Sequence, residues 1–165
     1  MTSVDPSKAL VRRHLRFGWW TLLLFLLLGA VLEGLHAYKV SYYLDVANET
    51  RRLLWTLAHT HGTLLALVHL AFAFTARELG LSGLIGWTRF ASFALSCASC
   101  LMPTGFWLGG LVIYDSDPGL GLILVPLGAA GLVVAVLWTA IISTRDGVAP
   151  EPHHEPSTPD ESPIG

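Results

Sequence analysis

Charged residues are scarce in this sequence, and that scarcity excludes most soluble folds. Aspartate, glutamate, lysine and arginine make up 13% of the 165 residues, whereas about 25% is usual in soluble domains. The few charges gather between long apolar runs, which is the pattern of a chain whose solvent is lipid. The sequence therefore predicts an all-α integral membrane protein surrounded by a lipid bilayer, and we expect that bilayer to be a bacterial plasma membrane.

Three further absences narrow the class of protein. A net charge of −2 gives no basic surface for nucleic acid. The two cysteines, Cys97 and Cys100, are too few for a disulfide framework. The first apolar run is too long for a signal peptide and no small-residue cleavage site follows it, so we interpret it as a retained helix.

Four apolar segments are each long enough for the roughly 20 residues that a membrane-spanning helix needs. Trp19 and Trp20, which follow several arginines, are typical of interfacial anchors at the start of the first segment. Pro103 and Gly105 predict a kink in the third segment, because proline removes a backbone donor. Together the segments predict a four-transmembrane-helix bundle within residues 1–145, with spans over residues 17–38, 53–76, 86–114 and 119–143.

The distribution of lysine and arginine predicts that the N-terminus and the C-terminus are both cytoplasmic. This orientation places seven basic residues inside, whereas only Lys39, Arg51 and Arg52 lie outside. Residues 146–165 contain five prolines and five acidic residues and little that is apolar. A segment of that composition cannot bury enough surface to fold, so we predict a disordered cytoplasmic tail.

Small residues predict how the helices pack, because lipid provides little hydrophobic reason for helices to associate. Gly105 and Gly109 form a G-x-x-x-G step in the third span, and Gly128 and Gly131 provide small residues in the fourth. These residues favour a compact bundle and provide faces for a homo-oligomer.

Ionisable residues inside the spans mark the candidate site, since such groups are costly in lipid and usually face the bundle interior. Glu33 and His36 lie near the outer end of the first span, and His59 and His61 lie near the outer end of the second. We therefore expect these four residues at similar depth in the outer leaflet. His69 lies too far along the second helix to share an ion with His59.

Helical periodicity separates the histidines further. His59, Gly62, Ala66 and His69 fall on one stripe about 80° wide, whereas His61 points almost the opposite way. Gly62 and Ala66 leave that stripe shallow, which is typical of a slot for a flat macrocycle such as haem beside a histidine ligand. Glu33 is a candidate to orient His59 by a hydrogen bond, and Trp107 is a candidate for the lining of the same cavity.

Other interpretations stay open at this point. The histidines can serve only to hold helices together, as buried polar groups in membranes often do. Cys97 and Cys100 share a helix face but are typical of small packing residues in an apolar helix. Ion or metal transport through Glu33, His36 and His59 would need an oligomer and lacks a second broken helix. A di-iron site would need two Glu-x-x-His motifs, and the sequence has only one.

Two motifs resemble a known family. The segment Ala58–Ala66 resembles the second-helix motif of the small four-helix membrane isomerases, the family of hydroxylaminobenzene mutase and styrene oxide isomerase. In that motif a small residue stands seven positions after a histidine. The residue directly before this small residue is often an asparagine. The segment Gly105–Leu108 resembles the third-helix motif of a glycine and two aromatic residues. The likeness covers only about 25 residues, which are the stretches of the second and third spans that carry the two motifs.

The resemblance implies haem b bound by His59. In the epoxide isomerase of the family, ferric haem acts as a Lewis acid with the help of an asparagine and a tyrosine. Leu65 and Trp107 stand at those two positions here, so epoxide isomerisation is not expected. We therefore expect a haem b or metal site in the outer leaflet with isomerase-like or redox chemistry. The alternative is a non-catalytic subunit or scaffold of a larger membrane complex.

Overall fold

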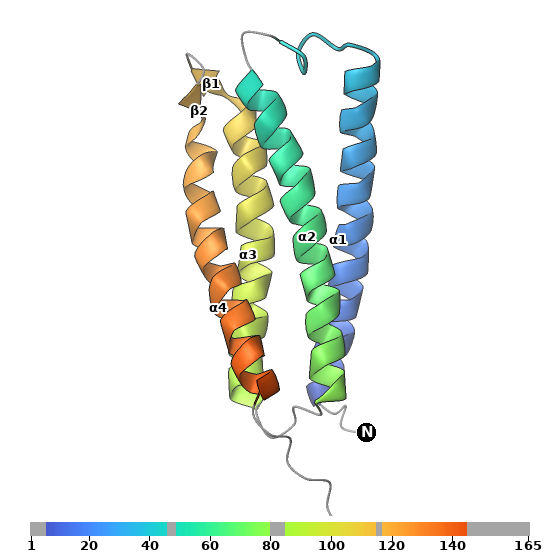
Figure 1. Cartoon of the computed structure of the whole chain (residues 1–165), viewed down its shortest axis with the longest axis vertical. Coiled ribbons are helices and arrows are strands. Elements are labelled where there is room, and N and C mark those ends of the chain that lie inside the picture. Colours follow the sequence, from blue (N-terminus) through green and yellow to red (C-terminus); the bar gives the residue numbers. More distant parts are fainter. Residues whose placement is uncertain (1–5, 46–48, 80–84, 115–116, 145–165) are drawn as a thin grey trace, which may run out of the picture.

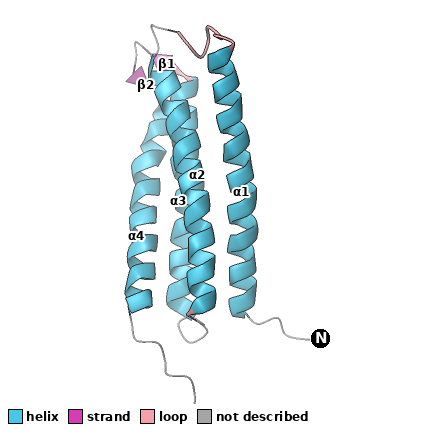
Figure 2. Ribbon diagram, turned by 45° about the vertical axis from the view of Figure 1, so that its right-hand side comes forward, coloured by secondary structure: helices cyan, strands magenta, loops and turns pink. Residues whose placement is uncertain are grey.

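The protein is a bundle of long helices (Figures 1 and 2). A computed structural model describes residues 6–45, 49–79, 85–114 and 117–144. Within these residues, four helices are long and apolar enough to cross a membrane, which confirms the predicted all-α four-helix bundle. They are α1 (Pro6–Ala37), α2 (Glu49–Glu78), α3 (Ile85–Leu111) and α4 (Leu124–Thr144).

The helices differ from the predicted spans mainly at their ends. Helix α1 begins at Pro6 rather than near residue 17, because proline suits the first helical position and the following lysine, leucine and arginine residues favour helix. Helix α3 ends at Leu111, before the predicted residue 114. A two-residue strand, β1 (Ile113–Tyr114), then pairs antiparallel with β2 (Asp117–Pro118). The 3₁₀ turn Leu120–Ile123 leads into α4. The predicted tail, residues 146–165, lies outside the described residues.

The helices stand in a row in sequence order, with α2 and α3 in the middle and α1 and α4 outside (Figure 1). In the most apolar part of each helix, 44% of the residues of α2 and of α3 are buried, against 11% in α1 and in α4. The outer helices therefore expose many large apolar side chains, such as Trp20 and Leu24 on α1. We call the end of the bundle that holds Pro6 and Thr144 the terminal end, and the opposite end the distal end.

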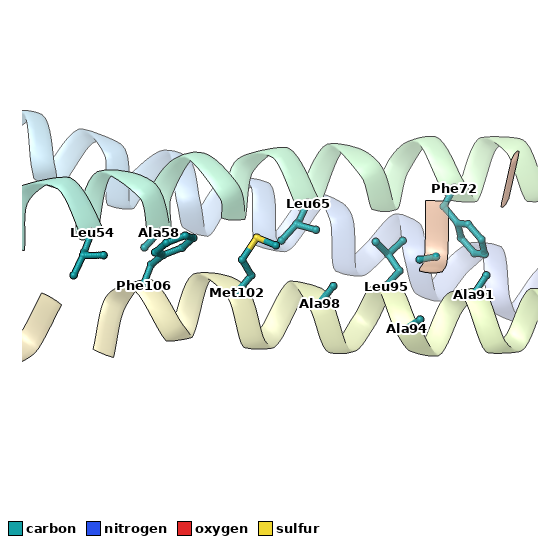
Figure 3. Close-up of a cluster of buried hydrophobic side chains, with 11 residues drawn as sticks. Leu54, Ala58, Leu65, Phe72, Ala91, Ala94, Leu95, Ala98, Met102 and Phe106 are labelled. Atoms are coloured by element: carbon teal, nitrogen blue, oxygen red, sulfur yellow. The ribbon is translucent and has the colours of Figure 1, made fainter. Parts of the chain in front are cut away.

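The main apolar core lies between α2 and α3 (Figure 3). Side chains of the two helices meet along this interface, as Leu65 does beside Met102 (Figure 3), and Leu65 and Leu95 are each only 1% exposed. This interlocking fixes the axial register of the two helices. The residues drawn and labelled in Figure 3 are Leu54, Ala58, Leu65 and Phe72 from α2, and Ala91, Ala94, Leu95, Ala98, Met102 and Phe106 from α3.

Glycines bring α3 and α4 together, as the small residues predict. A Cβ on Gly121, in the 3₁₀ turn that leads into α4, would lie 2.8 Å from the backbone nitrogen of Gly109, and a Cβ on Gly128 of α4 would lie 2.9 Å from that of Met102. Because backbone atoms cannot move aside as a flexible side chain can, only glycine permits these approaches. The α3–α4 pair is therefore held by close backbone contact.

Arg51 ties the distal end of the bundle together. Its side chain is buried and donates from Nε to the carbonyl of Gly110 (3.1 Å) and from Nη1 to the carbonyl of Tyr42 (3.0 Å). Its guanidinium also lies 4.0 Å from the centre of the Tyr42 ring. These contacts join the loop after α1, the start of α2 and the end of α3.

Candidate functional site

The stripe predicted on α2 faces α1 along its length. His59 contacts the backbone of α1 at Phe25. Further along, the ring of Phe25 covers Gly62. His69 contacts His14 near the terminal end. Helical periodicity therefore identified the side of α2 that packs on α1, and the stripe is mostly an interface between these two helices.

His59 lies in a notch in α1 made by Gly29. A Cβ on Gly29 would lie 2.8 Å from Nδ1 of the imidazole, so only glycine leaves room for the ring. The Nδ1 atom donates a hydrogen bond to the carbonyl oxygen of Phe25 (2.7 Å). Because a carbonyl can only accept, Nδ1 carries the proton, and Nε2 of the neutral ring carries the lone pair. The notch therefore fixes both the orientation and the tautomer of His59.

The other side of His59 opens into a cavity of about 260 Å³ between the distal halves of α1 and α2, which we call the distal hollow. Glu33 and His36 are exposed and also line the distal hollow, so three of the predicted site residues meet there. Nε2 of His59 has no hydrogen-bond partner among the described residues and is not buried. A larger cavity of about 600 Å³ adjoins it and shares His36, Tyr43 and Thr56 with it.

The group that orients His59 is a backbone carbonyl rather than Glu33. Among the described residues, the hydrogen bond of Nδ1 goes to Phe25, and none joins His59 to Glu33. This bond could not be predicted from the sequence, because every residue has a carbonyl. Gly29, one helical turn after Phe25, was the available signal, since a glycine in a span marks a place where another group comes close.

A flat macrocycle does not fit over Gly62 and Ala66 in this arrangement. The ring of Phe25 occupies the space over Gly62, and a Cβ on Gly18 would lie 3.2 Å from the carbonyl oxygen of Ala66. A ligand can instead reach His59 at Nε2, from the distal hollow. There a carbonyl holds Nδ1–H and leaves Nε2 free, which is the arrangement that metal-bound histidines usually have. The predicted slot is therefore closed, and the cavity that His59 lines is the distal hollow.

The ligand set near His59 suits haem better than a bare metal ion. No group of three or more histidine, cysteine, aspartate or glutamate side chains placed to hold a metal occurs within the described parts of the chain. A bare zinc ion in a protein normally needs three or four such ligands. Haem supplies four nitrogen ligands itself and needs only one or two from the protein.

The remaining candidates lie away from the distal hollow. Trp107 stacks on Trp55, with ring centres 4.5 Å apart, and its carbonyl accepts a hydrogen bond from Trp55 Nε1 (3.3 Å). It does not line the hollow. His61 faces α3, where its ring lies 4.9 Å from that of Phe106. The opposite directions predicted for His59 and His61 are therefore seen in the structure.

A second polar cluster, which the sequence did not reveal, lies in the terminal half of the bundle. His14 of α1 and His69 of α2 are each 1% exposed, and their Nδ1 atoms lie 2.7 Å apart. Each ring also bonds to a serine of α3: His14 Nε2 to Ser92 (2.7 Å) and His69 Nε2 to Ser99 (2.9 Å). Arg13 donates to the hydroxyl of Ser92 as well.

The hydrogen bonds of this cluster run in one direction when both rings are neutral. Ser99 donates its only hydroxyl proton to the carbonyl of Leu95, so it must accept from His69 Nε2. His69 Nδ1 then accepts from His14 Nδ1, and His14 Nε2 accepts from Ser92. Both ring nitrogens of both histidines are thus used. The cluster fixes the register of α1, α2 and α3 and leaves no nitrogen for a metal.

The cysteines of α3 are free thiols. Cys97 is half-buried, Cys100 is exposed, and the two do not form a disulfide. Neither lines the distal hollow.

Comparisons of the chain with protein-family models, with curated proteins and with solved structures gave no match.

Proposed function

We propose that this chain is an integral membrane protein that binds haem b through Nε2 of His59 at the distal hollow and uses it for isomerase-like or redox chemistry. The observation that carries this proposal is the hydrogen bond from His59 Nδ1 to the Phe25 carbonyl. It holds the imidazole in the tautomer that a metal ligand needs, with the coordinating nitrogen open to a cavity. The resemblance of Ala58–Ala66 to the second-helix motif of membrane isomerases supports the same residue.

The proposal includes an orientation in which both termini are cytoplasmic and the distal hollow faces outward. The terminal end carries most of the lysine and arginine residues, as the positive-inside rule requires. Arg51, one of three basic residues that oppose this orientation, is buried and bonded to two carbonyls at the distal end. The presence of Arg51 at the distal end is therefore explained by these hydrogen bonds, and it does not count against the proposed orientation.

The residues of the distal hollow have separate roles in this proposal. When bound, haem iron supplies Lewis-acid or one-electron chemistry. Phe25 and Gly29 hold the imidazole of His59 in place, since one supplies the acceptor and the other the space. Glu33 and His36, which line the same hollow, can take up or release a proton beside a bound substrate.

The test is the visible absorption spectrum of the protein purified in detergent from haem-replete cells. We expect a Soret band in the wild-type protein and its loss in His59→Ala. His61→Ala is the matched control, because His61 lies two residues away but faces Phe106, and we expect it to keep the band. A colourless wild-type protein, or a band that His59→Ala leaves unchanged, would overturn the proposal.

A second candidate function is a non-catalytic subunit of a larger membrane complex. The observation that favours it is the complete filling of the Gly62 face by Phe25, since the stripe then serves helix packing. This alternative predicts a colourless protein that co-purifies with a larger membrane protein. The absorption spectrum therefore separates the two candidates.

A further inference from the structure

A third cavity, of about 380 Å³, lies between α1 and α2 at the terminal end, far from the distal hollow. We call it the basic hollow. Three basic residues line it: Lys8 and Arg12 on α1 and Arg77 on α2. Three apolar residues, Val11, Leu15 and Ala76, line the rest of its wall together with Ser7.

The positive charge of the basic hollow is largely uncompensated. Arg77 pairs with its neighbour Glu78 at 3.1 Å, and both side chains are well exposed. Lys8 and Arg12 are exposed too and form no ion pair within the part of the chain that the structure describes. Arg13, in contrast, is engaged with Ser92. The cavity is thus lined by Lys8 and Arg12, which have no ion pair among the described residues, and by Arg77, which pairs with Glu78. A cavity with this charge is suited to an anion.

Polarity changes along the basic hollow in the direction of the helix axis. Lys8 and Arg77 lie at its outer part, and Leu15 lies deeper in the bundle. Arg12 lies about 10 Å along α1 from the exposed Trp19, at 1.5 Å per residue. Tryptophan marks the interface in membrane helices. The long side chain of Arg12 is therefore within reach of the headgroup layer, and Leu15, about 6 Å along the helix from Trp19, lies at the level of that layer.

We propose that the basic hollow binds an anionic phospholipid, with its phosphate between Lys8, Arg12 and Arg77 and its glycerol backbone against the apolar part of the wall at Leu15. Basic cavities between membrane helices on the cytoplasmic side suit such headgroups. Free phosphate would satisfy the cations but would leave the apolar part of the wall uncovered. A lipid satisfies both parts, and this combination favours a lipid as the source of the phosphate.

The test is native mass spectrometry of the full chain released from detergent, with dioleoylphosphatidylglycerol added at increasing concentration. We expect saturable binding of this anionic lipid and much weaker binding of dioleoylphosphatidylcholine. Loss of one cation should weaken binding of the anionic lipid about fivefold in Arg12→Gln, which follows from about 1 kcal/mol per basic residue. The control is Arg16→Gln, which removes an exposed arginine from the same helix outside the cavity lining and should leave binding unchanged.

Three results would overturn this proposal. The two lipids binding equally would show that the charge has no role. An equal loss in Arg12→Gln and Arg16→Gln would show that general surface charge, rather than the basic hollow, holds the lipid. Displacement of the lipid by millimolar inorganic phosphate would identify free phosphate as the ligand. None of these results bears on the haem proposal, because the two cavities share no lining residue.

Discussion

His59 and the His14–His69 pair show two ways in which an imidazole is held within an apolar bundle. In the pair, both nitrogens of each ring are hydrogen-bonded, so the rings can only join helices. In His59, one nitrogen is fixed by the Phe25 carbonyl and the other opens into the distal hollow. This difference separates His59 from the two buried histidines: of these three rings, only that of His59 keeps a nitrogen without a hydrogen bond to the described residues.

The buried cluster predicts a clear effect of Ser92→Ala on stability. The substitution leaves Arg13 and His14 Nε2 without the hydroxyl that both contact. We expect the free energy of unfolding in detergent to fall by about 1–2 kcal/mol, as for other buried groups that lose a partner. This loss would exceed the roughly 0.6 kcal/mol average for hydrogen bonds between membrane helices.

Ser96→Ala is the control for that measurement. Ser96 lies one turn further along α3, and among the described residues its hydroxyl bonds only to the carbonyl of Ser92 in the same helix. We expect a change below about 0.5 kcal/mol, the usual range for substitutions away from such networks. Equal losses in the two variants would contradict the role assigned to the buried cluster.

We expect a substitution at Gly29 to weaken haem binding even though the side chain of His59 is unchanged. A side chain at this position would occupy the space of the His59 ring, which must then move and lose its bond to the Phe25 carbonyl. We expect Gly29→Ala to weaken haem retention about 10- to 100-fold, as loss of a group that orients a ligand does. The measurement is haem content per chain during dialysis against a haem-binding protein.

Gly34→Ala serves as the matched variant, because a Cβ at Gly34 would meet no atom within 4 Å. Haem content should stay at the wild-type value there. If Gly29→Ala also retained its haem, the notch would have no part in binding.

The packing of α1 against α2 requires a glycine at position 62, because an aromatic ring of α1 lies over it. A Cβ on Gly62 would overlap the ring of Phe25. We expect Gly62→Ala to lower the free energy of unfolding by about 1–3 kcal/mol, the range for overpacked interfaces. The cost should be smaller when Phe25 is also changed to alanine, because the ring is then absent. Equal costs in the two backgrounds, measured by a double-mutant cycle, would show that the two residues do not interact.

The helix pattern of α2 was predictable, whereas the partners of its polar residues were not. A rotation of 100° per residue determines which side chains share a face, so the sequence placed His59, Gly62 and His69 together. It could not identify His14, which stands beside arginines ahead of the first predicted span. The serine that His14 bonds lies 78 residues away in the chain, and only the register of three helices brings them together.

At the scale of the whole molecule, the number of helices followed from the apolar runs, but their order in space did not. Lipid is as apolar as leucine, so an apolar helix face is equally acceptable against lipid or against another helix. The sequence therefore did not show that α1 and α4 would lie at the two ends of a row.

The proposed orientation predicts which end of the molecule reacts with reagents outside the cell. Ser41→Cys at the distal end and Thr144→Cys at the terminal end are suitable probes, since both residues are exposed. Each is made with Cys97→Ser and Cys100→Ser. We expect a membrane-impermeant maleimide to label the Ser41→Cys variant in intact cells and the Thr144→Cys variant only after permeabilisation. The reverse labelling pattern would contradict the proposed orientation and would mean that the distal hollow faces the cytoplasm.

The binding of iron by His59 is tested most directly by replacing the side chain with a free ligand. His59→Gly leaves the backbone of α2 in place and removes the imidazole, so added imidazole can enter from the distal hollow. We predict that His59→Gly purified from haem-replete cells lacks the Soret band of the wild type, and that incubation with haem and imidazole restores it. A wild-type protein without the band, or a His59→Gly protein that keeps it without imidazole, would contradict the role of His59.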